Sequence, residues 1–483
     1  MIHTEKSNNI IISALMPKSK AKKIYIIGIE GAGTSALAQV YAGLGYKVLG
    51  SDNGDHFYGD VLKRKKIKVF HSYAKENLPK GIDWVVYSTS IKNDNPEIIE
   101  AKEKKLKLYS YPEALGNLFN RKFGIAVCGT HGKTTTTAML AQILKESGTD
   151  PTAIVGSKVI QWKTNALAGG GNYFIIEADE YQNKFQYYNP WAVVLTSVDW
   201  DHPDFFSSFQ DYKNAFRNFT AKIPRHGFLV FCGDERNVIE AASGARCEKI
   251  SYGFSENSVY KIKICEPRIV DWSAKRKLQA FEIYRGNKSL GKFEIGLFGK
   301  HNILNAAAAV AAACKLGVSL KKIKAALKRF QGTARRFEYI GKRGGAILID
   351  DYAHHPQEIK ATLKAVKELY PRKNIITVFQ PHSYSRTEAL FSEFAQSFSG
   401  SSETIILDIY GSVRENSGIA HSRKLADLAN KYNPGRVKYI SSIREAVKFL
   451  KDKINNSDVI ISMGAGDVWK VTKELKVAKK LAK

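Results

Sequence analysis

A strand, a glycine loop and a helix follow one another in residues 123–137, and this order limits the possible folds more than any other feature. The segment reads FGIAVCGTHGKTTTT. Glycines let the backbone N–H groups of such a loop face a phosphate at a helix N-terminus. Lys133 can reach the β- and γ-phosphates, and the Thr134 hydroxyl can bind Mg²⁺. The first glycine of the usual pattern is Val127 here, but the context favours an ATP loop over a chance G-K-T turn. The predicted ATP-binding residues of the loop are Gly129, Thr130, His131, Gly132, Lys133, Thr134 and Thr135.

The same alternation of strand, turn and helix recurs along a chain of 483 residues, which is too long for one hydrophobic core. Short β-branched runs between helical stretches predict an α/β protein with doubly wound parallel sheets. The middle of the chain adds further strands over about 250–295. We predict a flexible tail and three domains. Their bounds are 1–22 for the tail, 23–122 for the N-terminal domain, 123–333 for the central domain and 334–483 for the C-terminal domain.

Composition narrows the class of protein. The formal charge of +28 comes from basic residues spread along the chain, without a zinc-finger, KH or RNP pattern. We therefore expect no nucleic-acid partner and favour a role for this charge with anionic substrates. Five scattered cysteines indicate reduced thiols and a cytoplasmic location. No apolar run reaches about 18 residues, so we expect no membrane insertion. We expect a monomer or a homodimer.

A second glycine loop opens the first predicted domain. In GIEGAGTSA, Gly31, Gly33 and Ala36 fit the pattern G-x-G-x-x-[GA], and Asp52 ends the next strand. This pattern suggests NAD with Asp52 on a ribose, but the same loop serves any diphosphate at a helix N-terminus. A nicotinamide-dependent dehydrogenase and a protein that binds a nucleotide-sugar diphosphate are both open at this point.

Acidic and histidine side chains gather at the ends of predicted strands in the central domain. Glu177, Asp179 and Glu180 crowd within four positions, which is costly unless a cation or a donor relieves it. A carboxylate such as Glu177 can hold Mg²⁺. His202 ends the next strand, and taken alone it is more often a structural histidine than a metal ligand.

Two loops of the third segment are rich in polar side chains. DDYAHHP (350–356) places carboxylates and histidines after a strand, and HSYSRT adds Arg386. The planar guanidinium of arginine suits a carboxylate or a phosphate. These loops therefore suggest a pocket for an amino acid or a phosphate group.

The motifs occur in one order along the chain: GTHGKTTTT, EADE, a D-H-P-D strand end, HNILNAAAA, RRFE, DDYAHHP and QPHSYSRT. Together they resemble the Mur ligase family over nearly the whole chain from about residue 22. With GIEGAGTSA at the start, the set is similar to the branch that joins L-alanine to UDP-N-acetylmuramate. The resemblance implies an N-terminal Rossmann-like domain for the UDP-sugar, a central P-loop ATPase-like domain with a mixed sheet, and a C-terminal Rossmann-like domain for the amino acid.

The resemblance also implies a reaction. In such an ATP-dependent carboxylate–amine ligase, the γ-phosphoryl group passes to the lactyl carboxylate of UDP-N-acetylmuramate. L-alanine then attacks the acyl phosphate, and an amide bond forms in peptidoglycan precursor synthesis. ATP and Mg²⁺ are the implied cofactors.

Site residues are implied position by position. The implied catalytic residues are Lys133, Glu177, His202, Arg336 and Asp351. The residues that would join the loop around ATP are Asn302, Asn305, Arg336 and Asp351. The implied metal ligands are Thr134, Glu177 and His202, with Glu177 on a first ion and His202 on a second. The implied UDP-sugar contacts are Gly28, Gly31, Ala32, Gly33, Asp52, Ser88, Thr89 and Ser90. The implied contacts of the amino acid and the muramoyl group are Tyr352, His354, His382 and Arg386. The arginine that the family usually carries at the end of its first domain is Tyr111 here.

Three other functions stay open. A murein-recycling ligase, which adds a tripeptide to the same sugar nucleotide, is closer to this chain in EADEY, but QPHSYSRT differs from the E-P-R-S-type segment of that branch. A dehydrogenase would leave the ATP loop, Glu177 and residues 350–356 without a role. A non-catalytic nucleic-acid binder rests on charge alone.

Overall fold

The computed structural model describes residues 22–54, 57–273, 276–411 and 420–477. The predicted tail at 1–22 lies outside the described residues, apart from Lys22. The chain divides into a first unit, Met1–Asn117 with Ala166–Gly169, and a second unit, Leu118–Asn165 with Gly170–Lys483. Three sheets with their helices confirm the predicted three-domain α/β fold. Among the described residues, no helix has both the length and the hydropathy needed to cross a bilayer.

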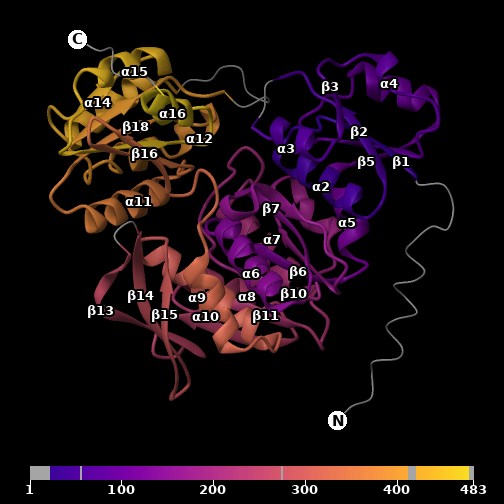
Figure 1. Ribbon diagram of the computed structural model, residues 1–483, viewed down its shortest axis with the longest axis horizontal. Coiled ribbons are helices and arrows are strands. Elements are labelled where there is room, and N and C mark those ends of the chain that lie inside the picture. The colour runs from indigo at the N-terminus through magenta and orange to yellow at the C-terminus, as the bar shows by residue number, and fades with distance from the viewer. Residues whose placement is uncertain (1–21, 55–56, 274–275, 412–419, 478–483) are drawn as a thin grey trace. The chain divides into compact units, whose positions relative to one another are not determined.

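The first unit, indigo in Figure 1, is built on a parallel sheet of five strands. In spatial order they are β3 (Lys68–Phe70), β2 (Lys47–Ser51), β1 (Lys23–Ile27), β4 (Trp84–Tyr87) and β5 (Lys107–Ser110). The order of the strands reverses between β1 and β4, which is where sheets of this kind bind nucleotides. Strand β1 reads KIYII and is almost fully buried, because helices cover both faces of a parallel sheet.

The helices of the first unit follow its strands in the chain. They are α2 (Ala32–Gly43), α3 (Gly59–Arg64), α4 (Pro96–Glu103) and α5 (Tyr111–Phe119), the last of which crosses the boundary between the units. The residues at the beginning of α4 explain why this helix begins at Pro96. The Asn95 side chain accepts hydrogen bonds from the N–H groups of Glu97 and Ile98, and Pro96 occupies the first helical position, where a missing N–H costs nothing.

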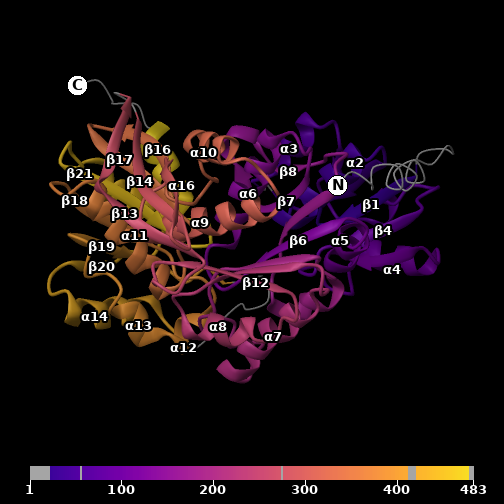
Figure 2. The ribbon, with the colours of Figure 1, turned by 90° about the horizontal axis from the view of Figure 1, so that it is seen from below.

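The second unit contains a ten-stranded sheet with the predicted extra strands at one edge. In spatial order its strands are β15 (Lys288–Ile295), β14 (Arg276–Arg285), β13 (Tyr260–Ser273), β12 (Glu248–Gly253), β11 (Phe228–Cys232), β10 (Ala192–Leu195), β6 (Phe123–Cys128), β9 (Tyr173–Glu177), β7 (Thr152–Val159) and β8 (Thr164–Leu167). Strands β13 to β15 pair antiparallel and form a long ribbon (Figures 1 and 2), whereas β6 pairs in parallel with both β9 and β10.

The helices around this sheet include α6 (Lys133–Ser147), α7 (Phe209–Ala221), α8 (Arg236–Ala242), α9 (Lys300–Lys315) and α10 (Leu320–Arg329). Helices α6 and α9 lie side by side in both views of the ribbon (Figures 1 and 2). The alanines between Ala306 and Ala313 are all fully buried. Their small side chains let α9 approach α6 closely.

The third sheet also belongs to the second unit. Its strands, in spatial order, are β16 (Glu338–Arg343), β17 (Ala346–Asp351), β21 (Asp458–Met463), β18 (Asn374–Phe379), β19 (Glu403–Ile406) and β20 (Val437–Tyr439). Only the edge strand β16 runs antiparallel among these pairs. The helices here are α11 (Pro356–Leu369), α12 (Tyr384–Ala389), α13 (Phe391–Ala395), α14 (Ser422–Tyr432), α15 (Ile443–Lys451) and α16 (Trp469–Val477).

Candidate functional site

The loop between β6 and α6 can adopt its curved path only with glycine at two positions. Gly129 and Gly132 have φ angles of +130° and +80°. A Cβ on Gly132 would lie 2.3 Å from Asn305 Oδ1, and a Cβ on Gly129 would lie 2.3 Å from Thr196 Oγ1. Positive φ and close neighbours both exclude larger residues. The loop leads directly into α6, a helix of 15 residues. The backbone N–H groups at the N-terminus of this helix favour the binding of an anion.

The ammonium group of Lys133 lies inside the curve of this loop. Its Nζ donates to the carbonyl oxygen of Gly129 at 2.5 Å and to that of Thr130 at 3.2 Å. It is 3.6 Å from Glu180 Oε2. Burial alone would lower the pKa of Lys133, but the carboxylates of Glu180 and Asp179 raise it above its ordinary value. Lys133 is therefore charged and directed at the loop.

Thr134 and Glu177 are brought together although 43 positions separate them. Strands β6 and β9 are parallel neighbours, so the residues after them meet at one edge of the sheet. Thr134 Oγ1 donates to Glu177 Oε1 at 3.0 Å, and the Gly156 N–H donates to Glu177 Oε2 at 2.8 Å. Two of the three predicted metal ligands are thus adjacent.

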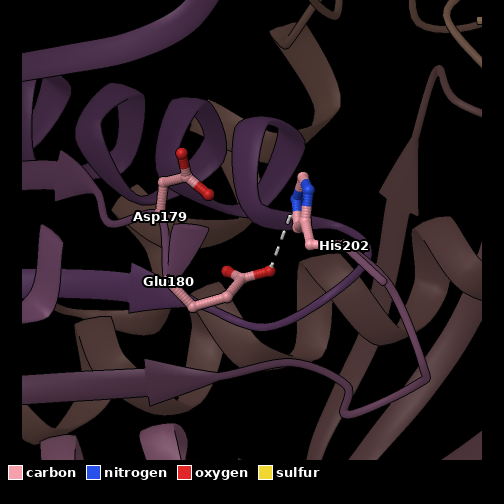
Figure 3. A group of neighbouring side chains, drawn as sticks. All are labelled: Asp179, Glu180 and His202. Carbon is pink, nitrogen blue, oxygen red and sulfur yellow. Dashed lines mark ion pairs between the residues drawn. The ribbon is translucent and has the colours of Figure 1, made fainter. Parts of the chain in front are cut away.

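The third, His202, lies in a different group with Asp179 and Glu180 (Figure 3). One ligand atom from each residue lies within 4.8 Å of the others, and the Glu180 carboxylate faces the imidazole at 4.0 Å. His202 has a φ of +56°, which is uncommon for histidine outside special sites. Tyr181 stacks on the His202 ring at 4.4 Å. Among the described residues, the group with His202 therefore contains Asp179 and Glu180 and not Glu177.

Glu180 contacts the residues around the phosphate loop, which its place in the acidic run did not predict. Its side chain is fully buried, and Oε1 accepts a hydrogen bond from the Tyr212 hydroxyl at 2.8 Å. Tyr212 also lies 2.8 Å from Thr130 Oγ1 in the phosphate loop. Among the described residues, Glu180 Oε2 has no hydrogen-bond donor, although Lys133 is nearby. A buried carboxylate oxygen of this kind suits a cation.

A cavity of about 400 Å³ lies next to the loop in the second unit. Such a volume is in the range of small-molecule sites. Eight of the predicted ATP-binding residues line it: His131, Gly132, Thr134, Thr135, Asn302, Asn305, Arg336 and Asp351. The asparagines come from α9, where Asn305 Nδ2 donates to Asn302 Oδ1 at 3.3 Å. The glycine loop, helix α9 and the residues Arg336 and Asp351 thus meet at one cavity.

Asp351 and Arg336 lie at the same end of the antiparallel pair β16–β17, since Asp351 is the last residue of β17 and Arg336 precedes β16. Asp351 accepts hydrogen bonds from the N–H groups of Phe337 (3.0 Å) and Ala353 (2.8 Å), so its carboxylate also organises its own loop. Burial raises the pKa of Asp351 to about 6, although Arg336 favours the ionised form. The guanidinium of Arg336 lies 4.8 Å from the centre of the Tyr352 ring.

The four residues predicted around the amino acid lie near one another in the second unit. Tyr352 and His354 have ring centres 5.2 Å apart, and His354 and His382 have ring centres 6.4 Å apart. Burial lowers the pKa of His354 to about 3, so this side chain is neutral at neutral pH. Arg386, however, is engaged with a residue that sequence reasoning passed over.

That residue is Asp201, beside His202 in DWDHPD. Arg386 Nε donates to Asp201 Oδ1 at 2.9 Å, and Nη2 forms an ion pair with the same oxygen at 2.9 Å. Both side chains are less than a tenth exposed. Burial would raise the pKa of Asp201, but Arg386 and His202 hold it well below its usual range. In this arrangement the Arg386 charge is balanced by Asp201.

In the first unit, the predicted UDP-sugar residues surround the ends of β1 and β4. A Cβ on Gly28, whose φ is +74°, would lie 3.0 Å from the Cβ of Ser88. Ser88 Oγ lies 2.8 Å from Ser90 Oγ. A Cβ on Gly33 would lie 2.5 Å from Tyr111 Cζ, so the tyrosine that replaces the usual arginine packs directly on the glycine loop.

Asp52, directly after β2, is tied to the glycine loop and to neighbouring residues by hydrogen bonds. It is 4% exposed, and Oδ2 accepts the Glu30 N–H at 2.8 Å. Oδ1 accepts the N–H of Asn53 at 2.9 Å and the Tyr73 hydroxyl at 3.3 Å. Asp52 therefore holds the glycine loop. Its neighbours Glu30 and Asn53 line a cavity of about 700 Å³ in this unit.

Comparison with known proteins gives one family throughout. Residues 23–123 match the Mur ligase family, catalytic domain; residues 127–313 match the Mur ligase middle domain; residues 335–466 match the Mur ligase, glutamate ligase domain. The UDP-N-acetylmuramate–L-alanine ligase of Clostridium acetobutylicum is 39% identical over 93% of this chain and 96% of its own length.

Solved structures agree in fold. The UDP-N-acetylmuramate–alanine ligase of Thermotoga maritima superposes with a TM-score of 0.77 at 24% identity, covering 94% of this chain and 98% of that one. A murein peptide ligase from Psychrobacter arcticus gives a TM-score of 0.70 at 25% identity over the same shares of the two chains.

Proposed function

Because the chain belongs to the Mur ligase family, we propose that it joins L-alanine to the lactyl carboxylate of UDP-N-acetylmuramate at the expense of ATP, in peptidoglycan precursor synthesis. The observation that carries this proposal is the convergence of the glycine loop, the α9 asparagines, Arg336 and Asp351 on one cavity. These residues would surround a nucleoside triphosphate with N–H groups, amides and a guanidinium.

The chain's own residues provide for a reaction between anions. ATP supplies the phosphoryl group that turns a poorly electrophilic carboxylate into an acyl phosphate. Lys133 and the loop N–H groups offset negative charge on the transferred group, and Arg336 adds a second cation at the cavity. The L-alanine amine then attacks the acyl carbon, and the amide forms as inorganic phosphate leaves and the nitrogen loses a proton. His354, being neutral, lies among the side chains proposed around the amine.

The residues present also fit magnesium. Thr134 and Glu177 would hold one ion beside the phosphates, since their oxygens are 3.0 Å apart at the loop. His202 with Glu180 and Asp179 would hold another, and the unpartnered Glu180 Oε2 supports this among the described residues. When bound, Mg²⁺ would supply positive charge at the phosphate oxygens.

The tripeptide ligase of murein recycling remains the second candidate, because a murein peptide ligase shares this fold. The full-length relative at 39% identity favours L-alanine. The deciding experiment measures phosphate release with UDP-N-acetylmuramate and ATP against L-alanine, glycine, L-serine and the tripeptide. We expect L-alanine to give the highest kcat/KM. Phosphate release with the tripeptide alone would replace the proposal by the recycling reaction.

The monomer or homodimer state and the cytoplasmic location remain predictions.

Gly33→Val is expected to weaken UDP-N-acetylmuramate binding about tenfold or more, equivalent to about 1.4 kcal/mol, with ATP affinity little changed. The new side chain would collide with the Tyr111 ring and would block the approach of a diphosphate to the loop. Calorimetric titration of both ligands measures the effect. The double variant Gly33→Ala with Tyr111→Ala separates the two causes, because it removes the collision but leaves a methyl group on the loop. A larger loss of ATP affinity than of UDP-sugar affinity would reassign the first unit.

Glu177→Gln is expected to raise the Mg²⁺ concentration for half-maximal activity by about 10–100-fold. The change removes a negative charge beside Thr134 and keeps the size of the side chain. Activity is measured over a Mg²⁺ titration at saturating substrates. Glu240→Gln is the matched control, since Glu240 pairs with Lys213 and Arg236 on the surface. A normal Mg²⁺ requirement in Glu177→Gln, together with a raised one in Glu180→Gln, would move the essential ion to the His202 group.

A further inference from the structure

The carboxylate of Glu358 joins two loops that the sequence placed in separate domains. Glu358 is the third residue of α11, and its side chain is only 13% exposed. Oε1 lies 3.1 Å from His131 Nδ1 in the phosphate loop. Oε2 accepts the His354 N–H at 3.0 Å, in the turn proposed for the amino acid. One side chain therefore contacts both loops.

The first of these contacts sets the direction of the His131 ring. The backbone of His131 is held separately, since its N–H donates to Ser197 Oγ at 2.8 Å and its carbonyl oxygen accepts from Thr196 Oγ1 at 2.5 Å. With the backbone held, the ring turns toward Glu358 through Nδ1 and leaves Nε2 3.4 Å from Asp199 Oδ2. His131 lines the proposed nucleotide cavity, so the direction of its ring decides which ring atoms can contact the phosphates.

The charges of His131, Glu358 and Arg336 strengthen the contact between Glu358 and His131. Burial would lower the pKa of His131, but its hydrogen bond to Glu358 raises it above the ordinary value. Burial would raise the pKa of Glu358, but the hydrogen bond with His131 and the charges of His131 and Arg336 hold it well below the usual range. The Arg336 guanidinium lies 3.9 Å from Glu358 Oε1 and adds a further cation. A carboxylate shared in this way makes charge-assisted hydrogen bonds, which are stronger than neutral ones.

The second contact holds the turn before α11. Glu358 is three positions after the N-cap residue His355, whose Nδ1 accepts the Gln357 N–H at 3.3 Å. A glutamate at this position commonly accepts an N–H from the start of its own helix. Here the accepted N–H belongs to His354, one residue before the N-cap, and the remaining oxygen is left to face His131.

We propose that Glu358 is a positioning residue, which orients His131 toward bound nucleotide and ties that orientation to the His354 turn. The inference rests on the proposed function and extends it. Glu358 itself need not touch a reactant. Removing its charge affects the reaction through His131, so its effect depends on His131 being present.

The experiment is a double-mutant cycle with Glu358→Gln, His131→Gln and the double variant. ADP affinity is measured by calorimetry, and kcat and KM for ATP are measured by phosphate release. We expect Glu358→Gln to lower ADP affinity and kcat/KM for ATP by about tenfold to 100-fold, the range for a charge-assisted hydrogen bond. In the His131→Gln background the same change should cost less than about threefold. UDP-sugar affinity should stay unchanged.

The control is Glu403→Gln, which removes a carboxylate that pairs with Lys438 and Lys453 away from the cavity. It should leave ADP affinity unchanged. If Glu358→Gln does not fold, Glu358→Asp, which keeps the charge but is one methylene shorter, takes its place in the cycle. Additive effects of the two substitutions, or normal ADP affinity in the Glu358 variant, would overturn the inference. Absence of ADP binding or ligation in the wild type would instead overturn the proposed function.

Discussion

Replacing Lys133 by alanine should lower the rate of ligation by about a thousandfold, the upper range for loss of one group that stabilises transition-state charge. Lys133 is the ammonium group inside the curve of the loop, hydrogen-bonded to two loop carbonyls and facing Glu180. Without it, negative charge on the transferred phosphoryl group loses the ammonium group that the loop provides. Single-turnover phosphate transfer at saturating ATP measures the loss directly, without product release.

Two measurements make this result specific. UDP-N-acetylmuramate affinity should remain normal, because its proposed residues belong to the first unit. Lys145→Ala, at an exposed position on the same helix α6, should keep full activity. A Lys133 variant that loses UDP-sugar affinity to the same extent as turnover would contradict the separation of the two sites.

Arg386→Ala should reduce the free energy of unfolding by about 3–5 kcal/mol and abolish most activity. The substitution leaves the Asp201 carboxylate buried without its partner, and that loss exceeds what the pair contributes when intact. Arg386→Lys keeps the charge but loses the planar arrangement of Nε and Nη2, so it should also be impaired. Urea unfolding and steady-state kinetics measure the two effects.

The double variant Arg386→Ala with Asp201→Asn distinguishes a partner of Asp201 from a substrate contact. It removes the buried charge, so it should recover a large part of the lost stability. If Arg386 instead binds the carboxylate of L-alanine, Arg386→Lys would raise KM for L-alanine with unchanged stability. Near-normal turnover in both single Arg386 variants would remove this residue from the site altogether.

The features that could be predicted from the sequence are those built from neighbours in the chain. A β-branched run, two glycines at a curve and a helix start place Lys133 and Thr134 at one loop, because their spacing is short and covalent. The same reasoning predicted the glycine loop with Gly28 and Gly33, and the extra strands over 250–295. Family resemblance then supplied the order of three α/β domains, which the sheets bear out.

Asp52 shows what a local pattern leaves open. The G-x-G-x-x-[GA] loop followed by an acidic strand end suggested a ribose contact, yet both carboxylate oxygens accept hydrogen bonds from Glu30, Asn53 and Tyr73. A pattern states which residue types are present at a strand end. It does not state whether a buried carboxylate is already satisfied by the protein, because that depends on side chains brought in by β3 and the turn after it.

The sequence by itself therefore determined the loops and the kind of ligand that we propose for them, and only the tertiary structure decided which side chains meet across them. The placement of β9 and β10 on either side of β6 puts Glu177 beside Thr134 and Thr196 beside Gly129. Glu358 reaches His131 across 227 positions, and Arg386 reaches Asp201 across 185. Strand order and domain packing are set by the burial of apolar faces over the whole chain, so no local spacing encodes these pairs.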